Sequence, residues 1–140
     1  MKLNETTNAL LEKRFGKDSL MALATCVNNI PSVRTVDACY RDGAFYVITY
    51  ALSGKMQQIG KNPRVSLCGE WFTAAGIGVS LGYVGKMENA EIFAWLREMF
   101  AAWIDNGHND FSDENTVILK IALTEGVLFR QGVRYEIDFS

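Results

Sequence analysis

The feature that most constrains this chain is an Asp-Gly pair, Asp42-Gly43, which lies between two runs rich in β-branched and aromatic residues. Such a pair is the strongest short-range signal for a two-residue β-hairpin, because both central residues of a type I′ turn need positive φ angles. The two arms of the hairpin are predicted over residues 33–41 and 44–51. Everything that follows in the chain has to be arranged around this ribbon.

The two-residue loop also predicts which residues pair across the hairpin, and paired residues share a face of the sheet. The predicted pairs are Arg41 with Ala44, Tyr40 with Phe45, Val36 with Thr49, and Arg34 with Ala51. Arg34, Val36 and Thr49 are therefore predicted to lie together.

A short helix is predicted directly after the hairpin, over residues 54–60, with Ser53 as its N-cap. Lys55 then falls in the first turn, where a cation opposes the helix dipole by about 0.3–1 kcal/mol. The free N–H groups at the same end of the helix attract an anion, so a bound phosphate would reconcile the two. The alternative is a solvated lysine on a short surface helix that has a routine serine cap.

Composition predicts a single globular domain over residues 1–140, because 49% of the residues are hydrophobic and 21% are charged. The formal net charge of −2 and the absence of a basic stripe argue against a nucleic acid or an anionic membrane as the main partner. Residues 1–15 contain charges and no continuous apolar stretch, so neither a signal peptide nor a membrane anchor is predicted. We therefore expect a cytoplasmic protein.

Cysteine and histidine usage argues against metal and disulfide chemistry. Cys26, Cys39 and Cys68 lie in strand-like runs without a Cys-x-x-Cys spacing, and their odd number does not fit a disulfide framework. The only histidine, His108, lies in a polar loop far from any cysteine in the sequence. No metal site and no histidine-based catalysis are predicted.

The rest of the chain reads as two further helices and several strands. The helices are predicted over residues 7–15 and 90–104, and the strands over 19–27, 65–72, 76–87, 116–123 and 126–139. The stretch 76–87 is either a strand pair or one bent strand, whose glycines mark bulges or barrel corners rather than a nucleotide-binding loop.

The late helix, with Asn89 as its cap, carries a stripe that includes two tryptophans, and it either covers one end of the fold or forms a dimer contact. Six or seven strands with many non-local pairings predict a mainly β protein. The expected fold is a closed or nearly closed antiparallel barrel, with a short helix after the third strand and one longer late helix.

Several of these residues occur together in a known family. Residues 20–87 resemble the N-terminal signature of the pyridoxamine 5′-phosphate oxidase-like FMN-binding split-barrel superfamily. The residues that carry the resemblance are Leu23-Ala24-Thr25, Pro31, Arg34, Val36, Asp42-Gly43, Phe45-Tyr46, Thr49, Ser53, Lys55, Ile59, Asn62-Pro63 and Val65. The later helix and strands resemble its small, single-domain branch, which includes general-stress-like and nitroimidazole-resistance-like flavoproteins.

The resemblance implies a homodimer that holds two FMN molecules at the subunit interface, with residues 34–36 under the isoalloxazine ring. It implies that Arg34, Ser53 and Lys55 hold the phosphate or ribityl end of the flavin. Trp71 lies where the family's second subunit reaches the flavin, although it also reads as an interior barrel residue. The full set of cofactor-binding residues implied in this way is Arg34, Thr35, Val36, Asp37, Thr49, Tyr50, Ser53, Lys55, Trp71 and Ser80.

Departures from the vitamin B6 oxidase bear on the reaction. This chain has Cys39 and Gly54 where that enzyme has basic residues, and it ends at Ser140 without the C-terminal arginine and histidine that bind pyridoxal phosphate there. Oxidation of pyridoxamine phosphate is therefore not expected.

The resemblance instead implies an FMN-dependent oxidoreductase that passes electrons from a nicotinamide donor to a small acceptor such as a nitroaromatic or a quinone. A non-catalytic flavin-binding stress or sensor protein is the alternative from another class. The same fold with deazaflavin or haem is a third possibility, and the single histidine, His108, disfavours haem.

Overall fold

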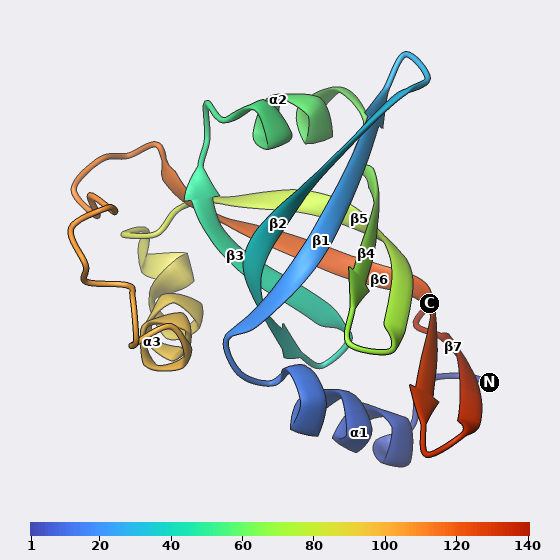
Figure 1. Ribbon diagram of the computed structural model, residues 1–140. Coiled ribbons are helices and arrows are strands. Elements are labelled where there is room, and N and C mark those ends of the chain that lie inside the picture. Colours follow the sequence, from blue (N-terminus) through green and yellow to red (C-terminus); the bar gives the residue numbers. More distant parts are fainter.

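One antiparallel sheet of seven strands makes up most of the molecule, and three helices pack around it (Figure 1). The computed structural model describes residues 1–140. The strands are β1 (Ser19–Val27), β2 (Ile30–Arg41), β3 (Ala44–Tyr50), β4 (Arg64–Gly69), β5 (Phe72–Tyr83), β6 (Thr116–Arg130) and β7 (Val133–Asp138). The helices are α1 (Glu5–Phe15), α2 (Gly54–Lys61) and α3 (Ala90–Met99), with a short 3₁₀ turn, η1 (Met87–Asn89), before α3.

Strand pairing closes the sheet into a barrel. The order is β3-β2-β1-β4-β5-β6-β7, and β3 also pairs with β6. Six strands therefore form the barrel, while β7 pairs with β6 and lies outside it. This arrangement confirms the predicted mainly β antiparallel split barrel, with a short helix after the third strand and a longer helix late in the chain. No helix combines the length and the hydropathy needed to span a bilayer.

Side chains from alternate strand positions fill the barrel interior, as the period of two requires. Phe15 of α1 packs edge-on against Phe45 of β3, with 5.7 Å between ring centroids, and so helps to close one end of the barrel. Helix α2 lies across the opposite end (Figure 1), where its residues Met56 and Ile59 are buried. This packing holds the N-terminus of α2 at the mouth of the barrel.

Helix α3 covers the outer face of the barrel wall, so it does not close an end of the barrel. Tyr46 and Ile48 of β3 point away from the interior and form a second buried cluster with Leu96 of α3. The helix ends at Met99, before the predicted residue 104. Asn89 occupies the predicted N-cap position, but its side chain makes no cap hydrogen bond, because its Nδ2 donates to carbonyl oxygens of β5.

Two predicted turn positions are wrong. Strand β4 ends at Gly69 and a tight turn through Trp71 leads into β5, which is one bent strand, whereas the sequence predicted a strand through residue 72. Strand β6 continues through Gly126 to a turn at Gln131-Gly132. Glycine is needed at position 126 because the ring of Phe72 packs against its backbone, where a Cβ would lie 2.9 Å from the ring.

The central hairpin opens sooner than predicted. Its ladder contains only three pairs and ends at Cys39 with Tyr46, so the predicted pairs of Val36 with Thr49 and of Arg34 with Ala51 do not form. Beyond this point β2 continues alongside β1, whereas β3 pairs with β6. Barrel closure is the reason, since β3 has to leave β2 to reach the other edge of the sheet.

Candidate functional site

The candidate site begins at the N-terminus of α2. Ser53 precedes the helix in an extended conformation, and its Oγ accepts a hydrogen bond from the backbone N–H of Met56 at 3.4 Å, which confirms the predicted cap. The first turn of a helix leaves backbone N–H groups without partners inside the helix. A Cβ added at Gly54 would meet nothing within 4 Å, so this turn is open on that side. An anion can therefore approach the backbone here.

Lys55 bends back from this turn toward the barrel. Its Nζ donates a hydrogen bond to Thr49 Oγ1 at 2.7 Å, which joins the end of β3 to the start of α2. Burial lowers the pKa of Lys55, and the nearby positive charge of Arg34 lowers it further. No carboxylate forms an ion pair with this lysine. Lys55 is thus a half-buried cation without a protein counter-ion.

Arg34 reaches the same region from β2. Its Nη1 donates to Thr25 Oγ1 at 2.8 Å and to the Leu23 carbonyl at 3.3 Å, and its Nη2 donates to Gln58 Oε1 at 2.9 Å. All three acceptors are neutral, and burial lowers the pKa of the guanidinium. Arg34 is therefore held firmly in place while its positive charge stays uncompensated.

Arg34 and Lys55, which we call the cation pair, share an environment that favours a bound anion. Each is close enough to the other for the charge of Arg34 to lower the pKa of Lys55. Two like charges without a counter-ion at a helix N-terminus would be stabilised by a dianion, which accepts charge-assisted hydrogen bonds from both. The structure thus brings Arg34, Thr49, Ser53 and Lys55 together, although not through the strand pairing predicted from the hairpin.

Two residues that brace Arg34 were missed by the sequence reasoning as site members. Gln58 Oε1 accepts hydrogen bonds from both Arg34 and Thr25, the latter at 2.5 Å. Gln58 lies three residues after Lys55 on α2, so the helical period could have placed it on the same side. Thr25 carries no such local signal, because it comes from β1.

The other predicted residues on β2 and β3 take different positions. Val36 is buried in the barrel interior with 7% exposure, so that only its backbone could face a ligand. Thr35 is exposed and Asp37 is half-buried, and both lie on the opposite, outer face of β2. Tyr50, at the end of β3, is 44% exposed.

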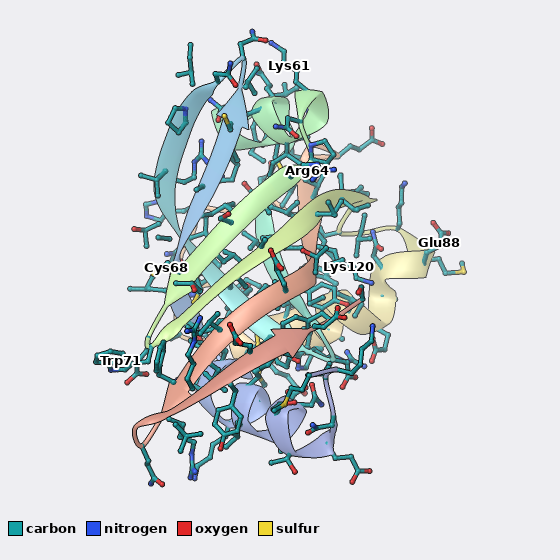
Figure 2. The ribbon with its side chains drawn as sticks, turned by 90° about the vertical axis from the view of Figure 1, so that its right-hand side faces the viewer. Lys61, Arg64, Cys68, Trp71, Glu88 and Lys120 are labelled. Carbon is teal, nitrogen blue, oxygen red and sulfur yellow. The ribbon has the colours of Figure 1, made fainter.

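Trp71 and Ser80 are not gathered with the cation pair within one chain. Trp71 lies at the tip of the turn between β4 and β5, and Figure 2 shows it at the opposite end of the molecule from Lys61 of α2. It is 72% exposed, so the alternative of an interior barrel residue is wrong. Ser80 is exposed on β5, and its Oγ accepts a hydrogen bond from the Gly82 N–H at 3.2 Å.

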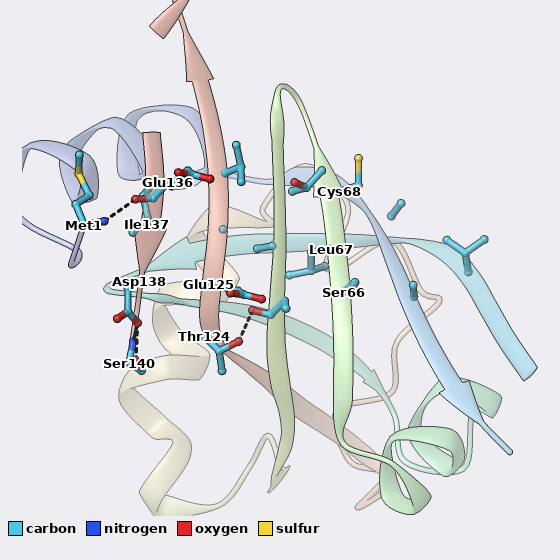
Figure 3. A pocket seen from close by; sticks show the side chains of 18 residues that line it. Met1, Ser66, Leu67, Cys68, Thr124, Glu125, Glu136, Ile137, Asp138 and Ser140 are labelled. Carbon is cyan, nitrogen blue, oxygen red and sulfur yellow. Dashed lines mark hydrogen bonds between the residues drawn. The ribbon is translucent and has the colours of Figure 1, made fainter. Parts of the chain in front are cut away.

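A broad trough lies on the outer face of the sheet, away from the cation pair. It has a volume of about 1010 Å³, and Figure 3 shows β4 and β5 crossing its floor between β7 on one side and β1 on the other. Many of its lining residues are small, including Ala22, Ala24, Ser66, Ala75 and Gly126. Exposed Val33 lies on its rim. The outer face thus offers an open surface on which small apolar residues lie beside the carboxylates of Glu125, Glu136 and Asp138.

Comparison with known proteins identifies a family and a shared fold. The model of a family described as pyridoxamine 5′-phosphate oxidase matches residues 4–128. No curated protein matches the chain.

Three similar solved structures illustrate the range of proteins with this fold. General stress protein 26 from Bacillus anthracis is 18% identical with a TM-score of 0.64, over 85% of this chain and 90% of that one. A FAD-binding protein from Mesorhizobium loti is 16% identical with a TM-score of 0.63, over 89% and 92%. The heme storage protein HutZ from Vibrio cholerae is 14% identical with a TM-score of 0.63, over 88% and 91%. At such identities the likeness is one of fold.

Proposed function

Because the chain belongs to the pyridoxamine 5′-phosphate oxidase family, we propose that it binds FMN through the cation pair and acts as an FMN-dependent oxidoreductase. The observation that carries this proposal is the cation pair itself, which joins two half-buried positive charges to the open N-terminus of α2 without any carboxylate. A phosphate monoester matches this chemistry, since it is dianionic and accepts several hydrogen bonds.

Each residue of the site has a distinct part in holding the phosphate. Arg34 and Lys55 supply charge, and the N–H groups that follow Ser53 supply further donors. Thr49 orients the Lys55 ammonium through its 2.7 Å hydrogen bond. Thr25 and Gln58 hold the guanidinium of Arg34 in place before any ligand arrives, which reduces the entropy lost on binding.

A bound flavin would supply the redox chemistry, the transfer of electrons from a nicotinamide donor to a small acceptor such as a nitroaromatic or a quinone. The protein's part would be to hold the phosphate through Arg34, Ser53 and Lys55 and so to fix the position of the flavin. Oxidation of pyridoxamine phosphate is not proposed, because Cys39 and Gly54 replace basic residues of the vitamin B6 oxidase.

We also propose that the protein works as a homodimer whose subunits meet through the trough on the outer face. Leu20 and Val33, which are 70% and 69% exposed, would be covered by a second copy. In such a dimer Trp71 and Ser80 would reach the partner's flavin, as the family resemblance implies. The test is the solution mass of the wild type and of Ala24→Glu, since an added carboxylate on the β1 side of the trough should give monomers. A monomeric wild type would contradict this part of the proposal.

The chromophore test separates the enzyme from its alternatives. Purified protein with absorbance maxima at about 375 and 450 nm, bleached anaerobically by NADH or NADPH, would support an FMN reductase. Colour that persists with every donor would favour a non-catalytic flavin-binding stress or sensor protein. Identification of the released chromophore by mass would expose a deazaflavin, a haem or FAD.

Removing the cation pair tests the site. Arg34→Ala combined with Lys55→Ala should weaken FMN binding by about 10²–10⁴-fold, because each charged hydrogen-bonding group contributes about 1.5–3 kcal/mol. Lys61→Ala is the matched control, since Lys61 is an exposed lysine in the last turn of the same helix. Equal FMN affinity in the double variant and the control would contradict the assignment.

A further inference from the structure

Asp18, in the connection between α1 and β1, has one satisfied and one unsatisfied carboxylate oxygen. Its Oδ2 accepts a hydrogen bond from the indole Nε1 of Trp103 at 3.0 Å. Its Oδ1 is buried and has no hydrogen-bond partner. It is the only buried side-chain polar atom of the chain without a partner. Such an atom is rarely left unpaired in a folded protein, because its lost hydration is not repaid.

Asp37, on the outer face of β2, lies close to Asp18, because Ser19, which follows Asp18, pairs with Ala38, which follows Asp37. Its pKa is raised from the ordinary 3.8 to about 6, first by burial, then by the hydrogen bond that it can donate to Asp18 when it carries a proton, and then by the negative charge of Asp18. Two carboxyl groups in contact cannot both ionise without strong repulsion, so one of them retains a proton over the pH range in which an isolated pair would lose both.

No other group nearby can neutralise the two aspartates. Neither forms an ion pair with a cation, and Lys17, next to Asp18 in the chain, is exposed. The thiol of Cys39 faces the same region, and burial raises its pKa to about 12, with smaller contributions from the charges of Glu12 and Asp18. Cys39 therefore stays neutral, and Glu12 adds only negative charge.

We propose that Asp18 and Asp37 form an acid pair that shares one proton, with the Asp37 hydroxyl donating to Asp18 Oδ1, and that this proton fastens Trp103 to the barrel. The proton satisfies the unpaired oxygen and leaves Oδ2 free to accept from the indole. Trp103 also packs on Phe100, with 4.9 Å between ring centroids, and Phe100 is fully buried in the cluster under α3. The acid pair is thus linked to the region where α3 ends, and it tightens this link in mildly acidic solution.

Loss of the proton reverses the effect. Once Asp37 ionises, two carboxylates face each other, and the one that holds Trp103 is pushed from its place. The acid pair needs no bound flavin, so it can be tested whether or not the chain binds FMN.

The experiment follows the three indole N–H signals of the full-length protein by ¹⁵N NMR between pH 4 and pH 8. The Trp103 signal should shift with a midpoint near pH 6 and should exchange faster with solvent above it. The Trp95 signal is an internal control, because Trp95 packs on Tyr46 and on Arg41 instead of on the acid pair. A Trp103 signal that does not change over this range would overturn the proposal.

Two variants assign the transition to the acid pair. Asp37→Asn can donate permanently through its amide, so the Trp103 signal should stay in its acidic position up to pH 8. Asp18→Asn should remove the repulsion and lower the pKa of Asp37, although burial should still keep that pKa above its ordinary value. The same transition near pH 6 in Asp37→Asn would assign the titration to another group and overturn the proposal.

Discussion

Strand β2 contributes one residue to each of two pairs of like charges, and the repulsion within the two pairs is relieved in different ways. Arg34 faces the end of the barrel with Lys55, whereas Asp37, three residues and about 10 Å further on, faces outward with Asp18. The aspartates can relieve their repulsion by sharing one proton. A guanidinium cannot give up its proton at any physiological pH, so Arg34 needs an anion from outside. The two aspartates therefore indicate a site that binds a proton, whereas the two cations indicate a site that binds an anionic ligand.

The largest expected difference between the two pairs is the response to FMN. At about 100 times its dissociation constant, a ligand stabilises the native state by about 2.7 kcal/mol, which corresponds to about 8 °C in the melting temperature for a chain of this size. Arg34→Ala with Lys55→Ala should abolish this shift, and Asp37→Asn should leave most of it in place. Thermal unfolding with and without FMN measures both. Equal shifts in all three proteins would remove the distinction between the pairs.

The pH dependence of FMN binding should follow Lys55. The pKa of Lys55 in the folded protein is lowered, so the lysine loses its charge at a lower pH than an ordinary lysine does. FMN affinity should therefore fall as the pH rises through the lowered pKa of Lys55. A fall of about tenfold corresponds to one lost charge-assisted hydrogen bond. Lys55→Arg should keep its affinity over the same range, because arginine does not titrate there. Titration of FMN fluorescence at several alkaline pH values provides the measurement, and an unchanged profile in Lys55→Arg would contradict the role of Lys55.

Removing one cation should stabilise the empty protein while it weakens binding. Lys55→Met replaces a half-buried charge, which lies near Arg34, by an apolar side chain of similar length. We expect a gain of about 1 kcal/mol in the free energy of unfolding without FMN, as is common where a functional site is relieved of strain. Urea unfolding measures the gain. Lys61→Met, at an exposed position of the same helix, should change little, and a loss of stability in Lys55→Met would show that the lysine is structural.

The smallest effect is expected from the acid pair on overall stability. The folded pKa of Asp37 is raised from 3.8 to about 6, so the folded chain keeps a proton that the unfolded chain releases between these values. Stability therefore falls as the pH rises from about 4 to about 6, and it levels off above that range. Because Asp37 is partly solvated, we expect a change of only about 2 °C in the melting temperature. Asp37→Asn should flatten the profile, and an equal slope in both proteins would contradict the raised pKa.

What could be predicted from the sequence was local. The Asp42-Gly43 turn, the Ser53 cap and the exact extent of β1 depend on neighbours in the chain, and all three are confirmed. The spacing from Thr49 to Lys55 is local too, and it brings these two side chains into contact.

What could not be predicted depends on partners far away in the sequence. The hairpin register failed beyond Tyr46 because β3 pairs with β6, about 70 residues later. The break predicted between residues 123 and 126 is wrong, because Gly126 lies within one continuous strand and packs against the ring of Phe72. The acid pair could not be predicted from a local sequence pattern, since Asp18, Asp37 and Trp103 are far apart in the chain.

The position of β6 between β3 and β5 has a consequence for the growing chain on the ribosome. Until residues 116–130 have emerged, β3 and β5 are both unpaired edges, and the interior that Leu119 and Ile121 fill stays open. A nascent chain that stops before Thr116 would expose both edges to other chains, and such edges promote aggregation. The residues from Thr116 onward therefore decide whether the part of the chain before them becomes a folded protein or a substrate for chaperones.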